Sequence, residues 1–546
     1  MADGSQRVFG SAKLIAACTL LSRVTGLLRD IVLNRVLGQD WVLDGWSFGF
    51  QIPNLFRRLF GEGALSALFV PAFTETLDRD GKPAAADLLA RVAALIVIIL
   101  SGLTLLIEAV VATLWLTLPP EPMRRLMLGL TGVMAPFMIS ICTLALLSSV
   151  LNCLHHFALP ALAPIVLNVC NIIGARYVGP ALSDRREVQV YGIAISVLVA
   201  SVLQIVIVLP VLRRHGLRLT LTPRFDDPRL RTMLRMFLPV LLGQGVLLVN
   251  VYLDSQVCTL LTRGPDQPET FHLLGRDIGY PLAGGALAAV SNAQRLYQFP
   301  LGVLAISLAT AAFPALARHA TRADLPSLRA ATGDALRLAL FEGLPAGIMM
   351  ILLAQPIVAM LFEGGRFTPA ASARAATVLA CYGLGMWAFC AQQIVTRTFY
   401  ALKDTLTPMW IGCALVALNQ LLNLTLIWHP RIREAAFGVS TSITSALFVL
   451  IGLLLLRRRT GGRLGGRVLF AACIRMGIAA AVAGGVAWSI RAALPAAPFG
   501  LSAGAAARVV RCLLPLSAAG VAYLAAAWAL RMDEVRWLLG RSAARV

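Results

Sequence analysis

Apolar segments of roughly 20 residues or more follow one another along almost the whole of this chain. A helix needs about 20 such residues to cross the ~30 Å hydrocarbon layer of a bilayer. The segments are continuously apolar instead of alternating, which favours helices over the strands of a barrel. Hydrophobic residues make up 58% of the sequence and charged residues 14%, which excludes a soluble globular fold. The predicted fold class is therefore an all-α polytopic membrane protein.

Clusters of proline, glycine and charge divide the chain into about 14 predicted transmembrane helices. The predicted spans cover residues 12–37, 45–73, 92–117, 126–153, 159–179, 188–212, 236–262, 284–316, 338–361, 375–402, 406–428, 435–456, 468–490 and 509–530. No small-residue cleavage site follows the first span, so we predict a retained helix and not a cleaved signal peptide.

The basic residues outside the spans predict the orientation of the chain. The two termini and the even-numbered loops carry 26 of them, and the odd-numbered loops carry 14. By the positive-inside rule, both termini are predicted to be cytoplasmic. The same rule accounts for the net charge of +21. Because no basic helix with interleaved aromatic residues accompanies this charge, nucleic acid is not a predicted partner.

Three landmarks recur along the chain at almost the same spacing. Pro71 recurs as Pro314 at an offset of 243 residues, Pro164 as Pro408 at 244, and Leu212-Arg213-Arg214 as Leu456-Arg457-Arg458 at 244. A spacing that covers an even number of helices predicts two six-helix halves in parallel orientation. Transporters built from such repeats carry the binding site between the two halves.

The predicted domain organisation follows from this repeat. Residues 1–212 form an N-lobe of helices 1–6, and residues 213–235 form a basic cytoplasmic linker. Residues 236–458 form a C-lobe of helices 7–12, and residues 459–546 form two appended helices, 13 and 14, with a cytoplasmic tail.

Eight arginines lie inside segments that are otherwise apolar. They are Arg23, Arg29, Arg35, Arg57, Arg58, Arg295, Arg397 and Arg475. An arginine at the centre of a membrane helix costs roughly 3 kcal/mol on insertion scales, and such residues face a wet cavity or bind an anion. A guanidinium group offers a planar fork of donors that matches phosphate oxygens. The sequence therefore predicts a transporter with a cationic central cavity and an anionic cargo, best matched by a diphosphate.

The segment SRVTGLLRD, residues 22–30, holds two of these arginines. On an unbroken helix Arg23 and Arg29 point about 120° apart, but Gly26 between them offers a place for the helix to bend. We predict that both line the cavity and bind substrate; the alternative is that they snorkel to an interface. Asp30, directly after Arg29, is predicted to have a gating or structural role.

The segment PNLFRRLFGEG, residues 53–63, holds two more. Arg57 and Arg58 point about 100° apart on a helix, which predicts different roles for them. Arg58 and Glu62 are spaced for an intrahelical ion pair, so a structural role is predicted for both, and Arg57 is left for the substrate. Asp44, expected in the short outer loop before this helix, is either a gate or a solvated loop acid.

Arg295 lies near the start of the eighth span, close to Pro300, which breaks the local hydrogen-bond ladder. Broken helices are typical of transporter sites, so Arg295 is also predicted to bind substrate. Arg397 and Arg475 lie near cytoplasmic ends of spans and are predicted to snorkel to the surface. Three acids lie within spans, and each is predicted either to hold a coupling ion or to pair with an embedded arginine: Glu108, Asp254 and Glu342.

The sequence contains no motif of an enzyme. It has no P-loop, no GxSxG, no HExxH and no acidic pair at metal spacing. The ten cysteines and six histidines form no cluster at metal spacing either. The prediction is a transporter without catalytic residues, metal site or cofactor, driven by a coupling ion or by the membrane potential.

Six segments together resemble the MurJ (MviN) lipid II flippases of the multidrug/oligosaccharidyl-lipid/polysaccharide exporter superfamily. They are residues 22–30, 50–75 (FQIPNLFRRLFGEGALSALFVPAFTE), 159–168 (LPALAPIVLN), 294–302 (QRLYQFPLG), 362–368 (FEGGRFT) and 399–405 (FYALKDT). The resemblance covers nearly the whole chain, and the first two segments are specific to this family.

The resemblance implies a fourteen-helix fold of two six-helix lobes in a V shape, with two extra helices that help form a groove for a polyprenyl tail. It implies export of lipid II, the undecaprenyl-diphosphate-linked peptidoglycan precursor, from the inner to the outer leaflet of the bacterial cytoplasmic (inner) membrane by alternating access, for cell-wall synthesis. The cavity arginines of the family match Arg23, Arg29, Arg57 and Arg295, and its functional outer-loop acid matches Asp44. Lipid II and membrane lipids are the expected partners, the cell-wall synthesis machinery is a further candidate, and the chain is expected to function as a monomer.

Three features depart from the family pattern. Gln294 stands where the family is usually acidic, Gln51 where it is often basic, and the outer loop at residues 262–285 is longer than usual. Two other functions stay open: export of another polyprenyl-diphosphate-linked sugar, and a non-transporting membrane scaffold or precursor receptor. A cation–drug antiporter of the same superfamily fits poorly, because a cavity with several arginines repels organic cations.

Overall fold

The computed structural model describes residues 2–61, 64–273, 275–462, 465–495 and 504–538. Within these ranges the side chains of residues 2–17, 19, 60–61, 64–67, 237–248, 273, 536 and 538 lie outside the description. The described backbone is almost entirely helical, which confirms the predicted all-α class apart from four short strands.

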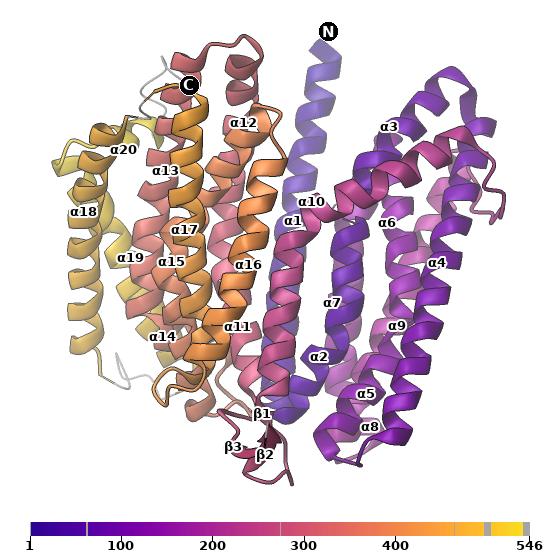
Figure 1. The fold of residues 1–546 in the computed structure, drawn as a ribbon, viewed down its shortest axis with the longest axis horizontal. Helices are drawn as coiled ribbons and strands as arrows, with labels where there is room; N and C mark the ends of the chain where they lie inside the picture. Colours follow the sequence, from indigo (N-terminus) through magenta and orange to yellow (C-terminus); the bar gives the residue numbers. More distant parts are fainter. Residues whose placement is uncertain (1, 62–63, 274, 463–464, 496–503, 539–546) are drawn as a thin grey trace.

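The first half of the chain contains nine α-helices and two π-helical turns within the described residues (Figure 1). They are α1 (Ala2–Leu37), α2 (Trp41–Phe56), η1 (Arg57–Gly61), α3 (Ala64–Arg79), α4 (Gly81–Thr117), α5 (Pro122–Met134), α6 (Phe137–Cys153), α7 (Ala158–Ile173), η2 (Gly174–Val178), α8 (Gly179–Leu182) and α9 (Arg186–Arg214).

The second half begins with the long helix α10, which crosses from one half of the molecule to the other (Figure 1). Its elements are α10 (Pro228–Leu260), β1 (Thr262–Arg263), β2 (Thr270–Leu273), β3 (Arg276–Gly279), β4 (Leu282–Ala283), α11 (Ala286–Val303), α12 (Ala305–Thr321), α13 (Leu325–Leu352), α14 (Ala354–Phe362), α15 (Pro369–Ala401), α16 (Leu406–Leu426), η3 (Arg433–Ala435), α17 (Ala436–Arg459), α18 (Gly466–Ala493), α19 (Ala505–Ala529) and α20 (Asp533–Leu538).

Several helices begin with the residue types that satisfy free N–H groups. Asp227 caps α10 by accepting from the N–H of Arg229, and Thr368 caps α15 by accepting from the N–H of Ala371. Proline stands in the first turn of both helices, where its missing N–H costs nothing. Local sequence thus fixes where these membrane helices begin.

The buried apolar side chains form two separate clusters. One runs from Leu33 to Leu230 and includes Ala288 of α11, and the other runs from Cys258 to Val535. In Figure 1 the helices of the two halves stand side by side, with α1 and α10 between them. The domain boundaries at residues 212, 235 and 458 stay predictions, but each cluster gives its half a core of its own.

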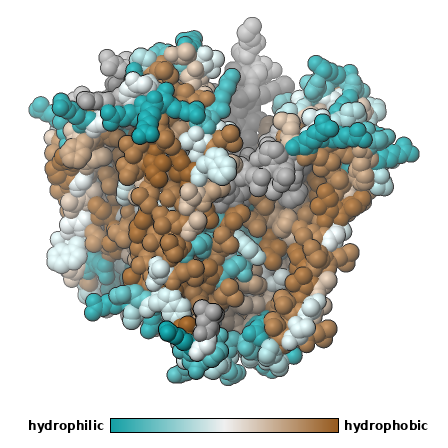
Figure 2. Space-filling view, viewed as in Figure 1, coloured by the Kyte–Doolittle hydropathy of each residue, from teal (hydrophilic) through white to brown (hydrophobic). Residues whose placement is uncertain are grey.

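Eleven helices in the described part of the chain are long and apolar enough to cross a membrane. Figure 2 shows a broad hydrophobic band around the visible face, with hydrophilic residues gathered toward its two ends. The other three predicted spans coincide with α1, with the run of α2, η1 and α3, and with α10. In each of these three, some of the side chains lie outside the description. The protein is therefore a multi-pass membrane protein, and the count of 14 spans stays a prediction.

Besides the span at 126–153, which is divided at Ala135 and Pro136 into α5 and α6, two predicted spans are interrupted in the structure. The span at 284–316 is divided at Leu304 into α11 and α12, and the N–H of Leu304 still donates to the carbonyl of Pro300. The span at 338–361 is divided at Leu353, and α13 begins earlier than predicted, at Leu325. Pro300 predicts a disruption close to the first break, although α11 continues through it to Val303. Apolar periodicity continues across Leu353, so the sequence pattern did not reveal the second break.

The predicted loop at 262–285 contains the four strands. β1 pairs with β4 in parallel, and β2 pairs with β3 in an antiparallel hairpin. This segment lies at one end of the molecule, the lower end in Figure 1, which we call the strand end. The beginning of α1 and the helix α20 lie at the opposite end.

Candidate functional site

A cavity of about 690 Å³, the first cavity, lies between the two halves of the chain. Its walls come from α1, α2, η1, α6, α7 and α9 of the first half and from α10 and α11 of the second. Among the described residues, the charged side chains in this lining are Arg29, Asp30, Arg57, Arg58 and Arg295. Four guanidinium groups against one carboxylate make the cavity cationic, and three of the four predicted substrate arginines belong to it.

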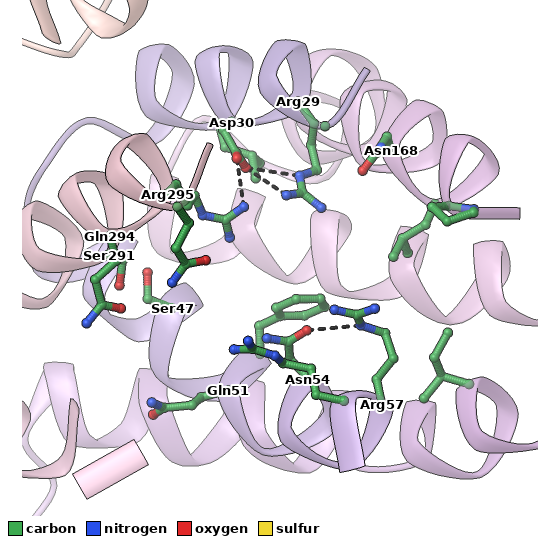
Figure 3. A pocket seen from close by; sticks show the side chains of 18 of the residues that line it. Arg29, Asp30, Ser47, Gln51, Asn54, Arg57, Asn168, Ser291, Gln294 and Arg295 are labelled. Atoms are coloured by element: carbon green, nitrogen blue, oxygen red, sulfur yellow. Dashed lines mark hydrogen bonds and ion pairs between the residues drawn. The ribbon is translucent and has the colours of Figure 1, made fainter. Parts of the chain in front are cut away.

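Asp30 links arginines from the two halves (Figure 3). Its Oδ1 accepts from Nε of Arg29 at 3.1 Å and from Nη2 of Arg29 at 2.8 Å, while its Oδ2 accepts from Nη1 of Arg295 at 2.7 Å. Asp30 is 8% exposed, whereas the Arg295 side chain is 44% exposed. One carboxylate therefore holds two guanidinium groups together, and the exposed side of Arg295 faces open space.

Arg57 and Arg58 begin the π-helical turn η1. Nε of Arg57 donates to Oδ1 of Asn54 at 3.1 Å (Figure 3). Both arginines line the first cavity, whereas α-helical spacing predicted that only Arg57 would face it. The reason is that the i→i+5 bonds of a π turn change the angle between successive side chains. Glu62, the predicted partner of Arg58, lies outside the described residues.

Neutral polar side chains complete the lining of the first cavity. They include Ser47, Gln51, Asn54, Asn152, Asn168, Gln204, Ser291, Gln294 and Gln298. Within the described part of the chain Oε1 of Gln51 is buried without a hydrogen-bond partner, and Gln294 donates to the hydroxyl of Tyr382 at 3.1 Å. Amide and hydroxyl groups can bind the hydroxyl and amide groups of a sugar or a peptide. Both positions that depart from the family pattern thus lie in this cavity.

A second cavity of about 1180 Å³ shares Gly26, Arg29, Asp30, Arg58 and Arg295 with the first. Away from these residues its lining is mostly apolar and comes from α1, from α10, from α11 to α15 and from α17 to α19. The appended helix α19 contributes side chains on one face, namely Cys512, Leu516, Ala519, Tyr523 and Leu524.

Arg23 lines the second cavity and not the first. The helix α1 continues through Gly26 without the predicted bend, yet Arg23 and Arg29 both line the second cavity, whereas only Arg29 lines the first. The guanidinium of Arg23 lies against the backbone of Gly302, where a Cβ would come within 3.2 Å of Nη1. Arg23 therefore stands where the cationic part of the site meets its apolar part.

A pair of amides joins the two halves beyond Asp30. Nδ2 of Asn34 donates to Oδ1 of Asn292 at 3.0 Å, and Nδ2 of Asn292 donates to Oδ1 of Asn34 at 2.7 Å. Both residues are buried, at 3% and 4% exposed. This reciprocal pair lies between α1 and α11, one helical turn from Asp30 and Arg295 on each.

Asp44 is neither in a loop nor solvated, which corrects one of its two predicted settings. It lies in the first turn of α2 and is fully buried. Its Oδ2 accepts from the N–H of Gly285 at 2.6 Å and its Oδ1 from the N–H of Ala288 at 2.7 Å. A carboxylate from the first half thus caps α11 of the second half, where the helix dipole also favours a negative charge.

Further contacts join the halves at the strand end. Nη2 of Arg35 donates to the carbonyl of Leu361 at 3.2 Å, and Nε2 of Gln39 donates to the carbonyl of Ala371 at 3.2 Å. Gln267 in the strand segment donates to the carboxylate of Glu121. Apart from those that Arg229 at the start of α10 donates to Thr76 and Asp80, the hydrogen bonds between the halves gather from Asp30 toward the strand end.

The remaining embedded arginines lie away from the first cavity. The guanidinium of Arg397 stacks over the ring of Phe313 at 5.5 Å, and Arg475 on α18 is exposed. A cation over an aromatic face is stabilised by the ring quadrupole. Snorkelling stays a prediction for both residues.

The three intramembrane acids have different surroundings. Asp254 is 2% exposed, and its Oδ1 accepts from Gln420 at 2.8 Å and from Asn423 at 2.7 Å. Glu342 lines the second cavity, and Glu108 lines neither. Within the described residues no group of three or more His, Cys, Asp or Glu side chains is placed to hold a metal ion.

Sequence reasoning missed the amides that position the site. Nδ2 of Asn168 on α7 donates to the carbonyl of Ser22 at 3.3 Å and to the Oγ1 of Thr25 at 3.2 Å, which fixes α1 against α7. Asn34 and Asn292 were missed as well. A usable signal was present, because an asparagine within an apolar membrane segment needs a partner inside the protein.

Comparison with known proteins agrees with this arrangement. A family model described as "Lipid II flippase MurJ" matches residues 33–499. The Burkholderia cenocepacia protein named lipid II flippase MurJ is 30% identical over 464 residues, which are 83% of this chain and 84% of that protein. A Rhizobium tropici protein named probable lipid II flippase MurJ is 30% identical over 440 residues, 79% of this chain and 78% of that protein.

Solved structures share the fold. The structure titled "Lipid II flippase MurJ, inward closed conformation" superposes with a TM-score of 0.72 at 21% identity, over 96% of this chain and 100% of that chain. An inward-facing multidrug resistance MATE family transporter of the MOP superfamily gives 0.63 at 14% identity, over 82% of this chain and 98% of that chain.

Proposed function

Since this chain belongs to the lipid II flippase MurJ family, we propose that it moves lipid II from the inner to the outer leaflet of the cytoplasmic membrane for cell-wall synthesis. The observation that carries the proposal is the first cavity, where four arginines and one acid face a space between the two halves. Guanidinium forks bind the oxygens of a diphosphate in pairs. The amides and hydroxyls beside them suit the sugar and peptide of the headgroup.

In this proposal the polyprenyl tail occupies the second cavity, whose lining is largely apolar and includes α19. The two cavities meet at Arg29, Asp30 and Arg295. A diphosphate lies between the sugar and the tail of the substrate, so it belongs at this junction. Arg23, on the apolar side of the junction, is placed to reach the phosphate nearer the tail.

The diphosphate competes with Asp30 for Arg29 and Arg295, which belong to different halves. Binding can therefore weaken an interaction between the halves while supplying a new anion to both arginines. The contacts of Asp44 and of the Asn34–Asn292 pair break when the strand end opens, and the headgroup is then exposed to the other side. This is alternating access with the tail kept in an apolar environment throughout.

The proposed setting is the bacterial inner membrane, with the strand end outside. The beginning of α1 and the helix α20 lie at the opposite end, which also carries the basic residues 213–214 and 457–459. The described conformation, joined at the strand end, is then the one that receives substrate from the cytoplasmic leaflet. One chain supplies both walls of the cavity, which supports function as a monomer, with the cell-wall synthesis machinery as a candidate partner.

For the driving force we propose a coupling ion at Asp254 in place of the membrane potential alone. Gln420 and Asn423 donate hydrogen bonds to its carboxylate, and no arginine or lysine of the described residues forms an ion pair with it. Asp254→Asn should make transport insensitive to an imposed sodium or proton gradient. If transport by this variant responded to the gradient as the wild type does, Asp254 would not be the site of the coupling ion.

The proposed function is tested with purified protein in proteoliposomes that contain a fluorescent lipid II. The protein should move lipid II between leaflets, Arg29→Ala should lose at least tenfold in rate, and Arg475→Ala should retain the wild-type rate. Transport of a different undecaprenyl-diphosphate sugar without transport of lipid II would support the alternative exporter. Binding of lipid II without movement would support the scaffold or receptor.

A further inference from the structure

The acidic residue Glu342 lies in an apolar part of the second cavity. It lies on α13 and lines the second cavity beside Pro345, Ala346 and Met349 of the same helix. Its Oε2 is buried and has no hydrogen-bond partner among the residues that the structure describes. The other acid in this lining, Asp30, is held by two arginines, so Glu342 differs from it in having no such partner.

The groups around Glu342 do not neutralise it. Cys390 approaches it from α15. The other titratable side chains of the lining are Tyr297 on α11 and Cys512 and Tyr523 on α19. Thiols and phenols ordinarily titrate above about pH 8, so they stay uncharged at neutral pH. The cations of the lining belong to α1, η1 and α11, and on α13 itself Arg337 pairs with Glu534 of α20. Arg475 on the neighbouring helix α18 is exposed.

An ionised carboxylate is incompatible with a hydrocarbon chain packed against it. Taking an unpaired charge from water into an apolar environment is so costly that the group is neutralised instead. When the cavity is empty, water can solvate the carboxylate. When a tail fills the cavity, that water is displaced, and the protonated, uncharged form of Glu342 is then the stable one.

We propose that Glu342 takes up a proton from water when a polyprenyl tail enters the second cavity and returns it when the tail leaves. This inference rests on the proposed function, because it assumes that the second cavity holds the tail. The proton converts the carboxylate to a carboxylic acid, and no other bond changes. Glu342 then makes the occupancy of the tail site depend on pH and links it to the transfer of one proton.

The dependence of tail binding on pH has a definite sign. Binding that requires the protonated acid is strongest at low pH and weakens as the pH rises above the titration of Glu342 in the empty cavity. The limiting slope is about tenfold in dissociation constant per pH unit for one linked proton. Replacement of the acid by a neutral amide of nearly the same shape removes the slope and keeps the tight binding at all pH values.

The test measures binding of heptaprenol, a polyprenol without phosphate, to the full-length protein in nanodiscs between pH 5.5 and 8. A neutral probe has no titration of its own, so any pH dependence belongs to the protein. The wild type should bind more weakly as pH rises, Glu342→Asp should keep this dependence, and Glu342→Gln should bind tightly at every pH. Glu108→Gln replaces another intramembrane acid, outside both cavities, and should behave as the wild type.

The outcomes separate the inference from the function on which it rests. Binding that is independent of pH in the wild type, or a slope that persists in Glu342→Gln, overturns the role of Glu342 and leaves the tail site intact. No binding of heptaprenol at any pH, in either protein, overturns the tail site and the inference with it. Flipping of lipid II, measured in parallel, tells whether transport survives in each case.

Discussion

At the scale of single residues, Asp30 is the group on which the candidate site depends. It accepts hydrogen bonds from Arg29 of the first half and from Arg295 of the second. Without it, two guanidinium groups would face each other across the cavity with no anion between them. Asp30 therefore keeps the cationic site assembled while no substrate is bound.

Asp30→Asn should lower the rate of lipid II flipping at least tenfold in proteoliposomes. The amide is of nearly the same size but carries no charge, so each charge-assisted hydrogen bond, worth about 1.5–3 kcal/mol, is replaced by a weaker one. The control is Asp226→Asn, because the Asp226 side chain is 79% exposed and lies outside both cavities. Equal flipping rates for the two variants would show that Asp30 is dispensable.

Asp44 is predicted to hold the strand end closed. Asp44→Ala leaves the N–H groups of Gly285 and Ala288 without partners, at a cost of about 1–3 kcal/mol for each buried group. In a background without the native cysteines, a cysteine in place of Ser47 in the first cavity should then be labelled faster by an impermeant thiol reagent added outside. Asp44→Asn, which retains one acceptor oxygen, should give an intermediate rate. Unchanged labelling in both variants would contradict the role of Asp44 as a gate.

The sequence was informative about the residues that carry charge. Arg29, Arg57 and Arg295 could be predicted because an arginine inside an apolar segment needs an anion or water. The partners of Asp44 could not be predicted, because Gly285 and Ala288 contribute backbone N–H groups, which every residue except proline has. Arg23 lines only the second cavity, whereas Arg29 lines both, and this difference depends on which residues of α11 and α12 lie opposite α1, which is a tertiary property.

At the scale of elements, the N-terminus of α11 determines how closely the two halves approach. Gly285 precedes this helix with φ of +86°, and a Cβ there would overlap the carbonyl oxygen of Gln39. The same helix then presents Asn292 and Arg295 to α1. One helix start thus sets the position of an amide pair and of a cavity arginine.

Gly285→Ala should destabilise the protein more than Gly275→Ala. Both glycines have positive φ, which costs an alanine about 1–2 kcal/mol, but a Cβ at Gly275 meets nothing within 4 Å. The extra effect at Gly285 is therefore the overlap with Gln39. Thermal unfolding in detergent measures it, and equal melting temperatures for the two variants would argue against the close approach.

The element boundaries show where sequence reasoning stops. The predicted spans coincide with helices because hydrophobic length is a property of each segment alone. The break predicted at Pro300 lies at Leu304, and the break at Leu353, the π turn after Phe56 and the strands at 262–283 were not predicted. Packing between segments decides such features, and the apolar pattern continues through the two breaks unchanged.

At the scale of the whole molecule, transport requires that the contacts at the strand end break and re-form. A reversible cysteine cross-linker between positions 39 and 371, where Gln39 donates to the carbonyl of Ala371, should therefore stop lipid II flipping. Cleavage of the cross-link should restore it. A cross-linker between Leu328 and Phe341, which lie 13 residues apart on the single helix α13, is the control that does not join the two halves. Full transport with the strand end cross-linked would contradict alternating access.

The sequence could predict the two-part architecture from its repeated landmarks, but not which end of the molecule is joined. Loop charges predict how the chain lies in the membrane and are the same in every conformation. Which contacts are made depends on a difference of a few kcal/mol between conformations of one sequence. Only the arrangement of α1, α2 and α11 in the structure therefore shows that the strand end is closed.

The proposal that this chain flips lipid II is tested most directly in a bacterium that is depleted of its own flippase and carries this chain. The quantity to measure is the amount of lipid II exposed on its outer leaflet. The wild type should restore exposure, Arg29→Ala should not, and Arg475→Ala should, with all three proteins inserted at equal levels. Stable insertion of the wild type without restored exposure would contradict the proposal that this chain flips lipid II.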